Sequence, residues 1–288
     1  MAIDVTIKQR LFGSKTMPLA VILGESLHYG NFVSDRLIVG ELGDNEIVAY
    51  HPEHIGRGFS VVWNPNEKRK IDLRLPMPST REELSDFYAA VERMVEYWGG
   101  KLVVDGNKIS LPDFLAGFED MAEFNDKIIR HFAQQILDGE SETLTLYSAM
   151  WPLAVGEQEA EAFLADPGRY ALWLHEKQTV DAGYAVAAFY EGENGILGQY
   201  TFMNGKSCIF LQTPRAPFGA IDPSTGKALE YSGWSVVLEL AGGEEPLGEL
   251  DYAEFLHRIP KDKLVAYDGD KVRILAMDEN EIRALIAE

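Results

Sequence analysis

The most informative pattern of apolar and polar positions lies between residues 182 and 213. Two Asn-Gly pairs, at 194–195 and 204–205, separate three runs that are rich in β-branched and aromatic side chains. Asn and Gly both accept the positive φ angles that a two-residue type I′ turn requires. The pattern therefore predicts an antiparallel meander of three strands, 182–191, 196–203 and 206–213.

The positions of these turns also predict which side chains face each other. With two-residue turns, Phe189 lies opposite Tyr200, and Tyr200 lies opposite Ile209. Both faces of such a sheet carry apolar side chains, so we expect helices or a second sheet to cover each face. Residues 231–240 are expected to add a further strand.

The N-terminal residues 1–75 have patterns typical of strands. Ile3, Val5 and Ile7 alternate with polar residues, and further short apolar runs are separated by glycines and turn residues. We expect an α+β protein with a β-rich lobe at 1–75, followed by a larger α+β domain at 76–288 that holds the meander. The alternative is that both parts form one compact body.

Two helical regions stand out after this lobe. Thr80 and Glu83 match a capping box, and apolar residues at helical spacing follow as far as Trp98, before a Gly-Gly pair. A second helical region extends over 112–137, where Gly117 or Asn125 can interrupt it.

Segments 101–109 and 263–272 are similar to each other. Each begins with Lys-Leu-Val and continues into a hairpin around Asp-Gly. A duplicated helix–hairpin–helix unit would produce this similarity, and so would the common chemistry of Asp-Gly hairpins. The sequence leaves both explanations open.

Three motifs carry a resemblance to a known family. They are Gly56-Arg57-Gly58, the run Asp-Leu-Arg-Leu-Pro-Met-Pro-Ser-Thr at 72–80, and Asp86-Phe87-Tyr88. Over most of its length the chain resembles a family of uncharacterised Firmicutes proteins that is defined as a domain of unknown function. The resemblance implies a cytoplasmic bacterial protein, and it supplies no activity and no catalytic residues.

Charge and cysteine content narrow the function classes. The chain has 46 acidic and 26 basic side chains, for a formal net charge of −20. Such an excess disfavours nucleic acids and anionic membranes, and it favours a basic protein partner or divalent cations. The single Cys208 excludes an intrachain disulfide, which fits a cytoplasmic location. We expect no signal peptide, because residues 1–8 lack an apolar run, and no membrane span.

The densest group of potential metal ligands is His51-Pro52-Glu53-His54. Imidazole and carboxylate groups suit zinc or iron. However, the histidines are three residues apart with a proline between them, unlike the helical His-Glu-x-x-His motif, and no third ligand is identifiable. We therefore assign no metal. Arg57, between two glycines, could hold an anion, so His51, Glu53, His54 and Arg57 are the candidate ligand-binding residues.

No motif for a cofactor or a catalytic nucleophile is present. The phosphate-binding loop, the dinucleotide fingerprint and the Gly-x-Ser-x-Gly elbow are all missing, and Cys208 lies on a predicted apolar face. We therefore expect no cofactor and name no catalytic residue. The leading hypothesis is a non-enzymatic binding or regulatory protein whose acidic surface docks a basic protein partner. The alternative is a hydrolase-type enzyme, with or without metal assistance, whose site lies near His51–Arg57 or under the irregular loop at 213–226.

Overall fold

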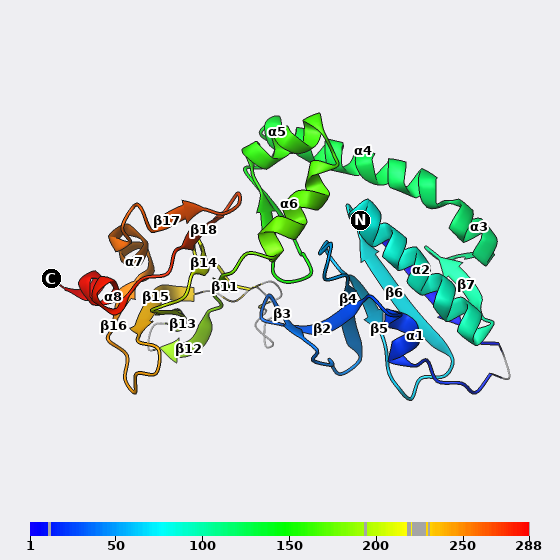
Figure 1. The fold of residues 1–288 in the computed structure, drawn as a ribbon, viewed down its shortest axis with the longest axis horizontal. Coiled ribbons are helices and arrows are strands. Elements are labelled where there is room, and N and C mark those ends of the chain that lie inside the picture. Colours follow the sequence, from blue (N-terminus) through cyan, green and yellow to red (C-terminus); the bar gives the residue numbers. More distant parts are fainter. Residues whose placement is uncertain (11–12, 193–194, 218–219, 221–228, 230, 288) are drawn as a thin grey trace. The chain divides into compact units, whose positions relative to one another are not determined.

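The computed structural model describes residues 1–10, 13–192, 195–217, 220, 229 and 231–287 (Figure 1). Its contacts divide the chain into two compact units. Unit 1 comprises Met1–Val33 and Leu37–Thr179, and unit 2 comprises Ser34–Arg36 and Val180–Glu288. The boundary predicted at residue 75 lies inside unit 1, where strands from both sides of it belong to one sheet. The α+β class is confirmed.

Unit 1 is built on an eight-stranded sheet with the order β3-β2-β4-β5-β6-β1-β7-β8. Its strands are β1 (Ala2–Lys8), β2 (His28–Val33), β3 (Arg36–Val39), β4 (Glu46–Tyr50), β5 (Phe59–Val62), β6 (Lys70–Pro76), β7 (Lys101–Val104) and β8 (Asn107–Ile109). The pairings from β2 through β8 are antiparallel. The strands predicted in 1–75 therefore form a sheet together with a hairpin that follows the first long helix.

The first four helices of unit 1 share a buried core with this sheet. The helices of unit 1 are α1 (Leu19–Leu23), α2 (Arg81–Trp98), α3 (Leu111–Ala116), α4 (Phe118–Leu137), α5 (Glu157–Ala165) and α6 (Arg169–Gln178). The short strands β9 (Leu144–Leu146) and β10 (Leu153–Val155) form a separate antiparallel pair. The predicted break at Gly117 is confirmed, because α3 and α4 meet there.

Helix α2 begins at the predicted cap and ends at the predicted glycine, but Glu83 does not complete the capping box, because its carboxylate accepts hydrogen bonds from Gly58 and Ser79. The hydroxyl of Thr80 accepts a hydrogen bond from the backbone N–H of Glu83 at 3.0 Å, which caps the first turn. Gly99 ends the helix in a left-handed conformation with φ of 56°. The apolar side of α2, which includes Leu84, Phe87 and Val91, packs on the inward side chains of the sheet in one buried core.

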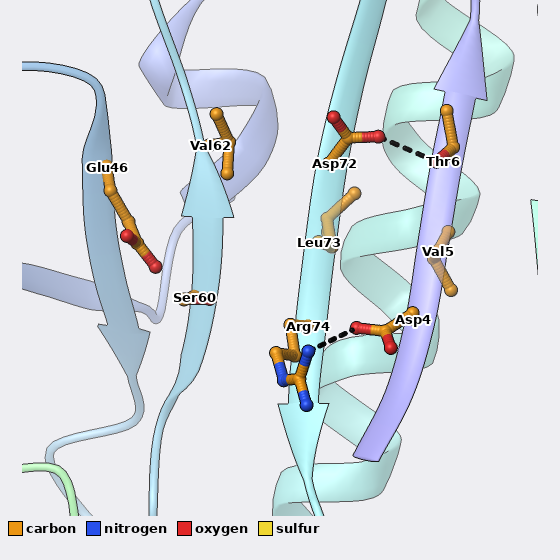
Figure 2. Close-up of a pocket in the computed structure, with 9 residues that line it drawn as sticks. All are labelled: Asp4, Val5, Thr6, Glu46, Ser60, Val62, Asp72, Leu73 and Arg74. Atoms are coloured by element: carbon orange, nitrogen blue, oxygen red, sulfur yellow. Dashed lines mark hydrogen bonds and ion pairs between the residues drawn. The ribbon is translucent and has the colours of Figure 1, made fainter. Parts of the chain in front are cut away.

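The opposite face of the sheet carries polar side chains. Figure 2 shows a shallow depression of about 330 Å³ across β4, β5, β6 and β1. There Thr6 donates a hydrogen bond to Asp72 at 2.6 Å, and Asp4 pairs with Arg74 at 3.3 Å. This face follows from the period-two alternation of β1, which buries Ile3 and Val5 on the other side.

Unit 2 contains two four-stranded sheets. The first has the order β11-β14-β18-β17, and its strands are β11 (Gly183–Tyr184), β14 (Cys208–Leu211), β18 (Lys271–Ile274) and β17 (Leu264–Ala266). The second has the order β12-β13-β15-β16, and its strands are β12 (Ala188–Gly192), β13 (Gly195–Met203), β15 (Tyr231–Glu239) and β16 (Gly248–Asp251). Helices α7 (Tyr252–Arg258) and α8 (Glu279–Ile286) join both sheets in one core.

The predicted three-stranded meander is wrong. β12 and β13 do form an antiparallel pair, but Phe189 lies opposite Gly198 rather than Tyr200, so the register differs from the predicted one. Residues 193–194, which include the first residue of the first predicted turn, lie outside the described part of the chain. Tyr200 lies opposite Val236 in a parallel pair, and Ile209 pairs with Arg273 in the other sheet. The predicted strand at 231–240 is confirmed as β15.

The second Asn-Gly pair explains this difference. Gly205 has the expected positive φ of 77°, but Asn204 does not have a positive φ, so the turn at 204–205 is not the predicted type I′ turn. The side chain of Asn204, however, accepts a hydrogen bond from Ala241, and the N–H of Gly205 donates to Met277. The turn thus carries the chain from one sheet to the other, because turn chemistry determines local backbone angles and not the partner of the next strand.

The predicted cover of both faces also fails at particular residues. Phe189, Tyr190 and Leu197 remain between 37% and 53% exposed.

Segments 101–109 and 263–272 both contain hairpins, β7–β8 and β17–β18. Among the described residues, no helix has the length and apolar character needed to cross a membrane.

Candidate functional site

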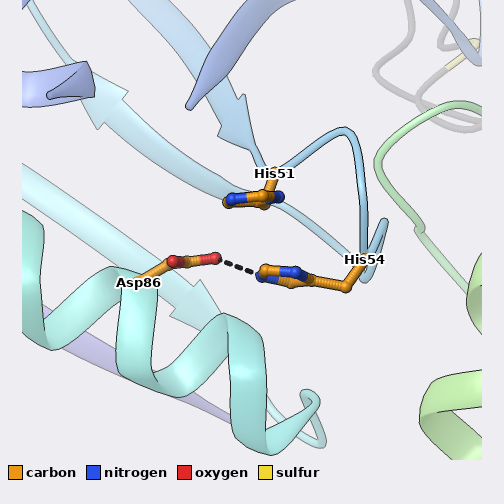
Figure 3. A group of neighbouring side chains, drawn as sticks. All are labelled: His51, His54 and Asp86. Carbon is orange, nitrogen blue, oxygen red and sulfur yellow. Dashed lines mark hydrogen bonds and ion pairs between the residues drawn. The ribbon is translucent and has the colours of Figure 1, made fainter. Parts of the chain in front are cut away.

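The candidate ligand residues lie in the connection between β4 and β5 of unit 1. β4 ends at Tyr50, and residues 51–58 turn back before β5 begins at Phe59. The turn brings the imidazoles of His51 and His54 face to face, with ring centroids 3.8 Å apart and an interplanar angle of 14° (Figure 3). The two histidines are therefore neighbours in space as well as in sequence.

Helix α2 supplies a third potential metal ligand beside the two histidines. Nε2 of His54 lies 2.8 Å from a carboxylate oxygen of Asp86 (Figure 3). His51, His54 and Asp86 each offer one ligand atom, and these atoms all lie within 4.8 Å of one another. All three residues are half-buried. Two imidazoles and one carboxylate form a ligand set that suits a divalent transition metal.

The other two candidates, Glu53 and Arg57, have different roles. Glu53 contributes its backbone N–H, which donates to Nδ1 of His51 at 3.2 Å. The side chain of Arg57 donates from Nε to the carbonyl of Tyr147 at 3.0 Å and from Nη1 to the carbonyl of Pro78 at 3.1 Å. These two donors of Arg57 fix the turn to neighbouring segments, so they are not directed at an anion.

Glu83 holds the turn against α2 from inside the protein. Its side chain is buried, and it accepts hydrogen bonds from the backbone N–H of Gly58 and from the hydroxyl of Ser79. Burial raises the pKa of the Glu83 carboxyl, while the bond from Ser79 and the charge of Arg57 oppose this effect. Asp86 follows Glu83 by three residues, which is almost one turn of the helix. The contact of Glu83 with Gly58 therefore brings Asp86 close to His54 in the connection between β4 and β5.

The two glycines of the turn are explained by this packing. A Cβ on Gly56 would lie 2.7 Å from the carboxyl group of Glu83. Gly58 has φ of +72°, and a Cβ there would lie 2.6 Å from a methyl group of Val48. The Gly-Arg-Gly motif is therefore required by a close approach and by a left-handed backbone, and not by an anion.

Helix α6 supports the other side of the turn. The side chain of Gln178 donates to the carbonyl of Gly56 at 2.8 Å. Nδ1 of His175 accepts from the backbone N–H of Ile55 at 3.0 Å. The turn is thus attached to both α2 and α6 by buried or half-buried hydrogen bonds, which makes it a rigid support for His51 and His54.

An open pocket of about 410 Å³ adjoins the cluster. It is lined by His54, Arg81, Glu82, Ser85, Asp86 and Phe118. The side chains of His54 and Asp86 are 33% and 21% exposed, so solvent and small molecules can reach them. The geometry therefore allows a ligand to approach the two residues directly from this pocket.

The sequence alone does not mark Asp86 as a partner of the histidines. It lies 32 residues from His54, and it is one of 46 acidic residues, so its chemistry gave no reason to select it. A signal was nevertheless present, because Asp86 belongs to one of the motifs that carry the family resemblance. All three of those motifs converge here: Gly56-Arg57-Gly58 contacts Glu83, and the run at 72–80 leads directly into α2.

Comparisons with known proteins agree with this resemblance. No match was found among curated proteins or among solved structures. A family model described as a domain of unknown function (DUF4299) matches residues 2–285, nearly the whole chain. The protein therefore belongs to the DUF4299 family.

Proposed function

We propose that unit 1 binds one divalent transition-metal ion through His51, His54 and Asp86. The observation that carries this proposal is the convergence of three donor groups from two separate segments, with ligand atoms within 4.8 Å of one another. Nitrogen from imidazole and oxygen from carboxylate suit zinc, iron or manganese. The net charge of −20 adds a general attraction for cations.

The hydrogen bonds of the two histidines support a role as ligands. Nε2 of His54 and a carboxylate oxygen of Asp86 lie 2.8 Å apart, so a metal ion that replaces the proton between them can bind both atoms. If His54 binds the metal through Nδ1 instead, Asp86 accepts a hydrogen bond from Nε2 and orients the ring, as carboxylates do beside metal-bound histidines. Ligation through Nε2 of His51 needs its proton on Nδ1, and this displaces only the 3.2 Å bond from Glu53.

The reaction class that fits this site is metal-assisted hydrolysis. Three protein ligands leave coordination positions for water and substrate, and a bound zinc ion lowers the pKa of its water to about 7. The residues of the chain would hold the metal and, through the rigid turn, position it at the wall of the 410 Å³ pocket. This is the metal-assisted hydrolase expected as the alternative from sequence, with Asp86 added.

Equilibrium dialysis tests the proposal. The metal-free protein is dialysed against zinc, manganese or iron(II), and the bound metal is measured by elemental analysis. We expect one equivalent in the wild type, and a loss of most of it in His51→Ala, His54→Ala and Asp86→Ala. The control is His131→Ala, a change to an exposed histidine on α4. Equal metal contents in the wild type and the three site variants would refute the proposal.

A basic protein partner, the leading hypothesis from composition, remains a second proposal. Its support is the net charge of −20, which attracts a basic protein surface. We also propose a location in the bacterial cytoplasm, which is supported by a single cysteine in 288 residues.

A further inference from the structure

The outward side of α2 has small residues at its centre and acidic residues toward its ends. Glu82, Ser85, Ala89, Glu92 and Glu96 follow one another at spacings of three or four residues, which places them on one side of the helix. All five are exposed or half-buried. The side chains of Ser85 and Ala89 are short, so the surface of α2 is recessed there between the longer glutamate side chains.

The junction of α3 and α4 forms a wall beside these small residues. Two depressions, of about 330 and 410 Å³, adjoin there and share Ser85 and Phe118. We call them together the α2 groove. The apolar part of its lining is Tyr88, Ala89, Leu115 and Phe118. A groove with an apolar centre between helices can hold the apolar side of another helix.

The charged groups that line the α2 groove are mostly acidic. Glu82 and Asp86 lie toward one end, and Glu92 lies toward the other. Among the described residues, no hydrogen bond or ion pair engages the side chains of Glu82 and Glu92. The one lining cation is Arg81, and it already binds both carboxylate oxygens of Glu119 at 2.6 Å.

We propose that the α2 groove binds a basic amphipathic helix of a protein partner. Glu82 and Glu92 are ten residues apart on α2, which is about 15 Å along the helix axis. A partner helix with lysine or arginine side chains about ten residues apart would reach both carboxylates. Its leucine-sized residues, at positions between the two cations, would lie on Ala89, Leu115 and Phe118.

The negative charge of the protein disfavours other ligands in the α2 groove. A nucleic acid or an acidic helix would bring further negative charge to Glu82, Asp86 and Glu92. A second copy of this chain also carries a net charge of −20, which opposes self-association through an acidic groove. Two of the proposed metal ligands, His54 and Asp86, line one end of the α2 groove. Glu92 lines the other end and is not a ligand, so variants of Glu92 test this inference separately from metal binding.

Fluorescence anisotropy with designed peptides tests this inference. The probe is a labelled helical peptide of leucine, alanine and lysine, with two lysines ten residues apart and the leucines between them on the same side. We expect saturable binding to the full chain that weakens at high salt, because rim charges are screened. The same peptide with glutamate in place of lysine is expected not to bind.

Variants of α2 test whether the peptide binds in the α2 groove. Glu92→Lys is expected to weaken binding about tenfold, because an attraction becomes a repulsion. Glu96→Lys is the matched control: it makes the same charge change on the same side of α2, outside the groove lining. Metal binding is expected to be unchanged in both variants. Absence of binding to the lysine peptide, equal binding of the glutamate peptide, or equal effects of Glu92→Lys and Glu96→Lys would each overturn the inference.

Discussion

Glu83 of helix α2 accepts a hydrogen bond from the backbone N–H of Gly58, which lies 25 residues before it in the chain. This buried contact joins the turn between β4 and β5 to the helix. Asp86 follows Glu83 by three residues and lies 2.8 Å from His54 on the same turn. A structural contact inside the protein and a candidate ligand contact at its surface therefore depend on the same pair of segments.

Removal of the Glu83 side chain should destabilise unit 1. Glu83→Ala leaves the buried N–H of Gly58 and the hydroxyl of Ser79 without their present acceptor. We expect the free energy of unfolding to fall by about 3 kcal/mol, which is the scale of an unsatisfied buried polar group together with a lost side chain. Urea unfolding measures it. A loss no larger than that of Glu82→Ala, an exposed neighbour, would contradict this role.

The variant Glu83→Gln tests the charge state of the same residue. Burial raises the pKa of folded Glu83 above the unfolded value of 4.5, so the folded protein binds the proton more tightly than the unfolded chain. The stability that this proton gives is fully present below pH 4.5 and is lost as the pH rises through the folded pKa. The glutamine keeps a neutral side chain, so the variant should gain stability relative to the wild type across this window. Urea unfolding at several pH values measures the difference, and a pH-independent difference would argue against a raised pKa.

The turn also depends on the backbone of Gly58. Gly58→Ala combines an unfavourable left-handed φ with a Cβ that lies 2.6 Å from Val48. Gly106→Ala is a matched control, because Gly106 has a similar φ of +81° and nothing within 4 Å of the added carbon. We expect the control to cost about 1 kcal/mol and Gly58→Ala to cost clearly more. Equal losses in thermal or urea unfolding would show that the contact with Val48 is unimportant.

Asp86 should affect metal binding much more than folding. Asp86 is half-buried and contacts His54 through its carboxylate, so Asp86→Asn keeps the shape of the side chain and removes its charge. We expect metal affinity to fall about 10- to 100-fold, as it does when a carboxylate beside a metal-bound histidine is lost. Competition with a chromogenic chelator measures the affinity. Glu82→Gln is the control, and an equal loss there would point to a general effect of charge.

The thiol of Cys208 in unit 2 should be unreactive in the folded protein. Burial raises the pKa of Cys208 to about 12, compared with about 8.5 for a free thiol. At pH 8 the thiolate fraction is then lower by about three orders of magnitude. We expect a disulfide reagent to modify the native protein about a thousandfold more slowly than the protein in denaturant. Similar rates in the two conditions would contradict the structural role expected for this cysteine.

Local sequence signals predicted the elements of the fold better than their pairing. The cap at Thr80, the helix end at Gly99 and the strand at 231–240 all depend on nearby residues, and all are confirmed. The partner of a strand depends on distant residues. β13 pairs in parallel with β15, whose aligned residues lie about 35 positions further along the chain, so the Asn204-Gly205 turn could not reveal this choice.

The candidate site shows the same limit. His51 and His54 could be selected because they are close in sequence and rare in type. Asp86 could not, because its role arises only when α2 packs on the sheet and Glu83 holds the turn. Arg57 was expected to face an anion, yet the fold directs two of its donors to backbone carbonyls. Packing, and not residue type, decided which of these side chains meet.

The ligands of the proposed metal site can be identified directly by X-ray absorption at the zinc edge. The account predicts that the zinc-loaded wild type shows backscattering from two imidazole rings, with zinc–nitrogen distances of about 2.0 Å, and from oxygen. In His54→Ala one imidazole should be lost, while His131→Ala should match the wild type. A spectrum without imidazole scattering, or one that is unchanged in His54→Ala, would contradict the assignment of His51, His54 and Asp86 as a metal site.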